Sequence, residues 1–126
     1  KKHGGSITGI ITHRICDYGK ASRLPDELIR LDTLGERKQM MLDKADVFIA
    51  LPGGFGTLDE IFTVIAAGHL GYHDKKVVFC NTNGFYNLLI NQIELFYRER
   101  FASPHYKNYY QIATNAEECI RILENF

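Results

Sequence analysis

The feature that most constrains the fold of this chain is a short apolar run that leads through a glycine-rich turn into a helical pattern. Residues 45–51 read Ala-Asp-Val-Phe-Ile-Ala-Leu and are apolar on both faces from Val47 onward. Such a run is typical of a central parallel strand that helices cover on both sides. Apolar residues then recur at i, i+3, i+4 and i+7 from Leu58 to Ile65, which predicts an amphipathic helix after the turn.

Strand and helix patterns alternate along the rest of the chain. Further strands are predicted at residues 7–11, 76–80 and, more weakly, 109–113. Further helices are predicted at residues 35–44, 85–96 and 116–123. Residues 13–33 are mixed and polar, and we expect only a short helix there, after Pro25. Alternating strands and helices predict right-handed crossovers and an α/β fold, a Rossmann-like doubly wound parallel sheet.

Four strands make a thin sheet of this kind. Gly4 and Gly5, which precede the first strand, are of the residue type that ends helices. A Rossmann-like sheet normally has one or two more strands on the N-terminal side, so we expect further βα structure upstream, about 60 residues for two units of about 30. Residues 1–126 are therefore expected to form a single Rossmann-like domain that lacks its N-terminal βα units.

Composition excludes several other classes of protein. The 126 residues are 45% hydrophobic and 24% charged, which fits one globular domain with a single core. Fifteen Lys and Arg balance fifteen Asp and Glu, so net charge provides no attraction to nucleic acid or to an anionic membrane. The apolar stretches are too short to span a bilayer. The cysteines lack metal or redox spacing, which favours buried free thiols in a reducing cytoplasm: Cys16, Cys80 and Cys119.

The glycine-rich turn has the features of an anion site. Its residues are Pro52, Gly53, Gly54, Phe55, Gly56 and Thr57. Open α/β sheets bind ligands at the carboxyl ends of their strands, and successive N–H groups at a helix N-terminus cradle phosphate without any cation. Asp59 stands where a dinucleotide fingerprint has its third glycine, and no Gly-Lys-Ser/Thr follows. The pattern therefore favours a monophosphate ligand.

A purely structural interpretation of the same residues remains open. Thr57 and Glu60 have the spacing of a capping box, in which the glutamate only returns to the N-cap N–H. The same spacing recurs at residues 114–117, where we infer no function. The glycines ahead of Thr57 favour the binding interpretation, because they cost conformational entropy unless the turn requires that backbone.

A second charged group precedes the apolar run. Glu36, Arg37 and Lys38 stand at the start of the helix predicted at residues 35–44. Helix neighbours point about 100° apart, so Arg37 and Lys38 cannot both lie flat against one partner, but they can flank a pocket from its rim. A solvated charged face is the alternative, but the planar fork of arginine matches phosphate oxygens.

Together these motifs resemble the LOG (Lonely Guy) family, long labelled possible lysine decarboxylases. The resemblance rests on Arg37-Lys38, on Ala45-Asp46 and on residues 52–60, Pro-Gly-Gly-Phe-Gly-Thr-Leu-Asp-Glu, and it covers nearly all of the chain. It implies a Rossmann-like, usually dimeric hydrolase of cytokinin biosynthesis that needs no cofactor. Its members split a nucleoside 5'-monophosphate, such as cytokinin riboside monophosphate or AMP, into free base and ribose 5-phosphate.

The resemblance also implies roles for individual residues. It makes Arg37 and Glu60 catalytic, and it makes six further residues substrate contacts: Lys38, Gly53, Gly54, Phe55, Gly56 and Thr57. N-glycosidic cleavage passes through an oxocarbenium-like state, which a carboxylate stabilises while it positions water. The alternative function is a non-catalytic carrier of a phosphorylated ligand, similar to molybdenum-cofactor carriers. Arg37 and Glu60 argue against it, because a carrier needs no carboxylate at the ribose.

Two other groups of residues have alternative interpretations. His69 and His73 have the i, i+4 spacing of metal ligands, but no third ligand is evident, which favours a polar helix end. Five aromatic residues near the C-terminus offer base stacking, but packing of the last helices is favoured: Tyr97, Phe101, Tyr106, Tyr109 and Tyr110.

Overall fold

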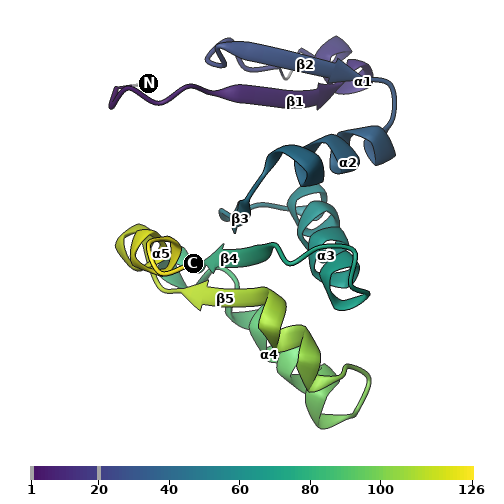
Figure 1. The fold of residues 1–126 in the computed structure, drawn as a ribbon, viewed down its shortest axis with the longest axis vertical. Helices are drawn as coiled ribbons and strands as arrows, with labels where there is room; N and C mark the ends of the chain where they lie inside the picture. Colours follow the sequence, from purple (N-terminus) through teal and green to yellow (C-terminus); the bar gives the residue numbers. More distant parts are fainter. Residues whose placement is uncertain (1, 20) are drawn as a thin grey trace. The chain divides into compact units, whose positions relative to one another are not determined.

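A computed structural model describes residues 2–19 and 21–126, which divide into two compact units. The N-terminal unit is Lys1–Ala45 and the C-terminal unit is Asp46–Phe126. Within each unit the strands run parallel and are connected through helices (Figure 1). This arrangement confirms the predicted α/β class.

The N-terminal unit pairs two strands. In chain order its elements are β1 (Thr8–Thr12), α1 (His13–Asp17), β2 (Glu27–Leu31) and α2 (Leu34–Lys44). β1 and β2 are parallel, with Thr8 opposite Glu27 and Thr12 opposite Leu31. A Cβ at Gly9 would come within 2.9 Å of the Leu28 side chain, so glycine permits the close approach of the two strands.

The prediction for residues 13–33 is wrong. The short helix, α1, precedes Pro25, and the residues after Pro25 form the strand β2. β2 carries Glu27 and Arg30 at exposed positions and has no fully buried residue. A strand in a small, partly solvated sheet lacks both the continuous apolar run and the strict alternation by which strands are recognised. The pairing with β1, rather than the local sequence, determines this strand.

The C-terminal unit contains the remaining elements. They are β3 (Val47–Ala50), α3 (Phe55–His69), β4 (Lys76–Cys80), η1 (Thr82–Gly84), α4 (Asn87–Arg98), η2 (Pro104–Tyr109), β5 (Tyr110–Ala113) and α5 (Ala116–Leu123). The described strands of this unit form one parallel sheet in the order β3-β4-β5. Apart from the 3-10 helices η1 and η2, these are the strands and helices predicted for this region, with bounds that differ by a few residues.

The core of this unit lies on both faces of β4. Val77 and Phe79 point to one face, where Ile93 of α4 lines a small cavity beside Phe79. Val78 and Cys80 point to the other face and cluster with Ala113 of β5 and with α5. Figure 1 shows α3 and α4 on one side of this sheet and α5 on the other. Helices therefore cover both faces, as the doubly wound prediction requires.

The central position predicted for residues 45–51 is not found in this sheet. β3 forms an edge of the sheet, next to β4 alone. Phe48 and Ala50 are buried, whereas Ile49 on the opposite face is 43% exposed. α5 packs over β4 and β5 and leaves Ile49 partly open. Both faces of this strand are thus apolar, but the described sheet buries only the face of Phe48 and Ala50.

Two of the three cysteines are core residues. Cys80 and Cys119 are buried free thiols, and Cys16 is a half-buried one. Burial raises the pKa of the Cys119 thiol, and the neighbouring Cys80 raises it further. The two buried thiols therefore have a packing role, as the sequence indicates.

Over residues 2–19 and 21–126, no helix has the length and apolar character needed to cross a membrane.

Truncation of a side chain on the buried face of α4 is expected to lower stability, whereas truncation on its exposed face is not. We expect Ile93→Ala to lower the free energy of unfolding by about 2–5 kcal/mol, because Ile93 is buried and its loss leaves a cavity. Leu88→Ala on the same helix is the matched control, with an expected change within about 0.5 kcal/mol, because Leu88 is 83% exposed. Urea denaturation of the full chain measures both. Equal effects would contradict the assignment of the core.

Candidate active site at the start of α3

The glycine-rich turn joins the end of β3 to the start of α3. Gly54 is the N-cap of α3, and its carbonyl accepts the first helical hydrogen bond, from the Leu58 amide at 3.1 Å. The amides of Phe55, Gly56 and Thr57 precede that bond and belong to the set that a helix leaves without intrahelical partners. A glycine N-cap has no side chain to accept from them, and the first turn carries no acidic residue. This end of α3 thus presents N–H groups and the positive end of the helix dipole.

Glycine is explained differently at the three positions of the turn, Gly53, Gly54 and Gly56. A Cβ at Gly53 would collide with the Thr57 side chain, whose Cβ and Cγ2 would lie 2.9 and 3.3 Å away. Thr57 therefore lies directly against the Gly53 backbone. A Cβ at Gly54 or Gly56 would meet no atom within 4 Å, and neither residue has a positive φ. The missing side chains at these two positions leave open space beside the turn.

The start of α3 also decides the capping-box alternative. In a capping box the hydroxyl residue is the N-cap and the carboxylate residue is N3. α3 begins at Phe55, so Thr57 is its third residue and Glu60 its sixth. The capping interpretation of Thr57 and Glu60 is therefore wrong. Glu60 is half-buried one and a half turns into the helix.

A true capping box occurs instead at the start of α2. The Thr33 hydroxyl accepts from the Glu36 amide at 3.1 Å, and the Glu36 carboxylate accepts from the Thr33 amide at 3.0 Å. Sequence reasoning grouped Glu36 with the charged residues that follow it and missed this role. The signal was present, because Thr33-x-x-Glu36 has the capping-box spacing.

Arg37 and Lys38 lie on α2 in the N-terminal unit. Both side chains are half-buried, which argues against a fully solvated charged face. The Arg37 Nε donates to the Ile10 carbonyl of β1 at 2.9 Å. This bond holds the guanidinium against the sheet of its own unit. The turn and Glu60 belong to the C-terminal unit, where the structure brings them together at one end of α3.

One buried residue beneath the turn had no predicted role. Tyr86 is 2% exposed, and its hydroxyl donates to the Leu51 carbonyl at 2.5 Å. The side-chain oxygen of Asn81 accepts from the Tyr86 amide at 2.7 Å. The two bonded residues, Leu51 and Tyr86, are 35 positions apart, so no local pattern predicts the contact.

The histidine pair closes the far end of α3. The His73 Nε2 is 3.0 Å from the Val64 carbonyl, and its Nδ1 accepts from the Lys75 amide at 3.0 Å. Both ring nitrogens of His73 are thus bound within the protein, which confirms the polar helix end for this residue. His69 stacks on Tyr106, with ring centroids 3.8 Å apart. No group of three or more His, Cys, Asp or Glu is positioned to hold a metal ion in the described part of the chain.

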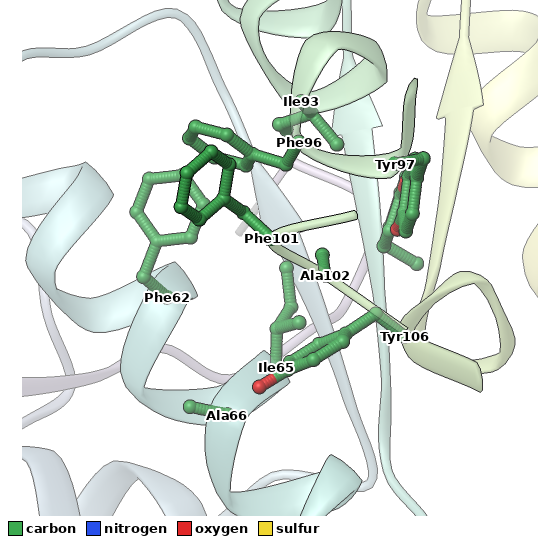
Figure 2. A pocket seen from close by; sticks show the side chains of 10 residues that line it. Phe62, Ile65, Ala66, Ile93, Phe96, Tyr97, Phe101, Ala102 and Tyr106 are labelled. Carbon is green, nitrogen blue, oxygen red and sulfur yellow. The ribbon is translucent and has the colours of Figure 1, made fainter. Parts of the chain in front are cut away.

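Four of the five aromatic residues near the C-terminus line a cavity of about 290 Å³ in the C-terminal unit: Tyr97, Phe101, Tyr106 and Tyr110. Figure 2 shows Phe62, Phe96 and Phe101 gathered at one end of it and Tyr106 at the other. At about 100° per residue, Phe62 and Glu60 point about 200° apart around α3, so the cavity and Glu60 lie on opposite flanks of the helix. Tyr106 stacks on His69 of α3, whereas base stacking by the other aromatic residues stays the alternative to their predicted packing role.

Comparison with known proteins agrees with these motifs. A family model described as "Possible lysine decarboxylase" matches residues 1–123. Cytokinin riboside 5'-monophosphate phosphoribohydrolase LOG5 of Arabidopsis thaliana is 38% identical over 98% of this chain and 54% of its own length. The protein named cytokinin riboside 5'-monophosphate phosphoribohydrolase in Mycobacterium tuberculosis is 36% identical over 94% of this chain and 63% of its own length.

A relative of the same name in Mycobacterium marinum is 42% identical over 69% of this chain and 46% of its own length. The chain thus spans about half the length of the curated relatives that it matches. The family match covers almost the whole sequence and includes both the Arg37-Lys38 pair and the glycine-rich turn with Glu60. This chain therefore belongs to the possible lysine decarboxylase family, the LOG family.

Proposed function

We propose that this chain carries the phosphate-binding turn and the catalytic carboxylate of a nucleoside 5'-monophosphate phosphoribohydrolase. The reaction is hydrolysis of the N-glycosidic bond, which yields free base and ribose 5-phosphate. The observation that carries the proposal is the placement of Glu60 on the same helix whose uncapped start follows the glycine-rich turn. The names of the relatives support the choice of this reaction for the family.

In this proposal the start of α3 binds the 5'-phosphate. The amides of Phe55, Gly56 and Thr57 donate to its oxygens, and the helix dipole favours its negative charge. Gly54 and Gly56 leave the space that the phosphate enters, since a Cβ at either position would project into it. Thr57 lies against Gly53 and thereby fixes the turn from its inner side.

Glu60 then acts on the ribose. It is five residues beyond Phe55, which is about 7.5 Å along the helix axis, and helical side chains point back toward the N-terminus. A phosphate at the turn therefore leaves the anomeric carbon level with the carboxylate. The carboxylate stabilises the positive charge that develops on the sugar and orients the attacking water. The water oxygen bonds to the anomeric carbon as the N-glycosidic bond breaks, and the proton that this water releases ends on the departing base.

The roles of two further residues and the substrate rest on the family motif. Arg37 is assigned as the second catalytic residue and Lys38 as a substrate contact, through the match of the Arg-Lys pair. A cytokinin riboside monophosphate or AMP is the expected substrate. Three features stay predictions: a homodimer or higher homo-oligomer, one Rossmann-like domain per subunit, and the cytoplasmic location that the cysteines favour.

The first test replaces the catalytic carboxylate. We expect Glu60→Gln to lower base release from AMP and isopentenyladenosine monophosphate by about a hundredfold or more, with an unchanged circular dichroism spectrum. Asp59→Asn is the matched control, because it removes the same charge from the neighbouring residue, about 100° around the helix, and retains activity. Chromatography measures the free base. A fully active Glu60→Gln variant would exclude the proposed mechanism, and nucleotide binding without turnover in the unmodified chain would favour the carrier.

The second test fills the space beside the turn. We expect Gly54→Ala to lower the melting temperature only slightly, because alanine is a poorer N-cap but its Cβ meets no protein atom within 4 Å. Its affinity for ribose 5-phosphate, measured by calorimetry, should fall about tenfold or more, because the methyl group occupies the phosphate position. Gly53→Ala should instead lower the melting temperature, because its Cβ collides with Thr57. Unchanged affinity in Gly54→Ala would place the phosphate elsewhere.

The third test concerns the arginine. Arg37→Lys keeps the positive charge but loses the planar fork, so we expect kcat/KM for AMP to fall about tenfold or more. Arg30→Lys on β2 of the same unit is the control, because Arg30 is exposed and outside the motif. Equal kcat/KM values in the two variants would remove Arg37 from the proposed machinery.

A further inference from the structure

A buried hydroxyl, that of Tyr86, is hydrogen-bonded to the backbone next to the glycine-rich turn. Tyr86 lies in the core of the C-terminal unit, with its ring edge-on to Phe79 at 5.4 Å between centroids. Its hydroxyl donates to the carbonyl of Leu51, the first residue after β3. Burial raises the pKa of the Tyr86 phenol, and a backbone hydrogen bond from Gly53 acts in the opposite direction. The hydroxyl is therefore bonded to the backbone immediately before Pro52.

The connection from β4 to α4 fixes Tyr86 in turn. Asn81 accepts from the Tyr86 amide at 2.7 Å and donates through its Nδ2 to the Asn87 side chain at 2.8 Å. Asn83 and Gly84 have positive φ values of 54° and 69°, so this connection turns sharply before Tyr86. Two observations favour glycine at position 84: its positive φ, and a distance of only 2.5 Å between a Cβ there and the Asn87 Nδ2.

We infer that Tyr86 is a positioning residue, whose hydroxyl holds the Leu51 carbonyl and thereby orients the amides at the start of α3 toward the substrate phosphate. The identity of that ligand rests on the proposed function, whereas the restraint on the turn rests on the contacts of Tyr86 alone. Tyr86 lies beneath the turn, and we assign it no contact with the reacting atoms.

The physical need for such a restraint comes from the turn itself. Gly53 and Gly54 give this segment more conformational freedom than any other residue type would. Hydrogen-bond donors stabilise an anion best when they are already oriented, because no reorganisation is then required on binding. A hydroxyl that holds the carbonyl ahead of the glycines limits this freedom at little cost, since Tyr86 is already ordered by the core.

The chain offers a closely matched control in Tyr110. Its ring is also edge-on to Phe79, with centroids 6.0 Å apart. Its hydroxyl is bonded to the Tyr97 hydroxyl at 2.8 Å rather than to the turn. Tyr86→Phe and Tyr110→Phe thus each remove one hydroxyl beside the same aromatic ring, and only the first removes a hydrogen bond to the backbone at the turn.

The test compares these two variants of the full chain with the unmodified protein. Amide hydrogen exchange by NMR reports on Gly53 and Gly54, calorimetry gives the affinity for ribose 5-phosphate, and base release from AMP gives kcat and KM. In Tyr86→Phe we expect faster exchange at the two glycines, an affinity about tenfold lower and a KM about tenfold higher, as for a lost hydrogen bond. We expect kcat to change less than about twofold, because the phosphate is held equally in the ground and transition states. Tyr110→Phe should leave all of these values unchanged.

The outcomes separate this inference from the proposed function. Unchanged exchange and affinity in Tyr86→Phe, or equal changes in both variants, would overturn the positioning role even if AMP is hydrolysed. A chain that binds ribose 5-phosphate but releases no base would exclude the hydrolase, while weaker binding and faster exchange confined to Tyr86→Phe would still support the positioning role. A chain that binds no ribose 5-phosphate would overturn both.

Discussion

The burial of β4 on both faces is the constraint on which the C-terminal unit depends. Val77, Val78, Phe79 and Cys80 are 0–3% exposed, so each face of this strand must be covered by a helix. Parallel pairing then places the carboxyl ends of β3 and β4 side by side at one end of the strands. The turn after β3 and the connection after β4 therefore begin next to each other. The bond between Tyr86 and Leu51, remote in sequence, follows directly from this topology.

The glycine-rich turn contains one glycine that packing explains and two that packing does not explain. Gly53 is explained within the protein, because Thr57 occupies the space of its side chain. Gly54 and Gly56 are not, because neither a close neighbour nor a positive φ requires them. Because the folded chain does not require glycine at these two positions, a bound ligand is the better explanation of the glycines there. The absence of side chains at these two positions is therefore the part of the motif most directly connected to the proposed phosphate binding.

The sequence predicted best what depends on strong local periodicity. The long apolar stripes gave α3, α4 and α5, and the apolar runs gave β3 and β4. β2 was missed, because a partly exposed strand with Glu27 and Arg30 has no distinctive period and is determined by its pairing with β1. The predicted site residues followed from motif and spacing, but spacing alone did not distinguish a capping box from a residue inside the helix. That distinction required the residue at which α3 begins.

Tyr86 marks a different limit, because its partner lies on another element and no spacing relates the two residues.

The orientation of Glu60 follows from the packing of the helix that carries it. Ile61, Val64, Ile65 and Gly68 are the buried residues of α3 and face the sheet. The contact is close at Gly68, where a Cβ would come within 2.5 Å of the Tyr109 ring. Because these four residues fix the rotation of α3, Glu60, which lies about 100° from Ile61, is held on the flank between core and surface. The same packing turns Phe62 toward the aromatic cavity on the opposite flank. The carboxylate thus shares its end of the helix with the glycine-rich turn and is separated by the helix itself from the apolar cavity.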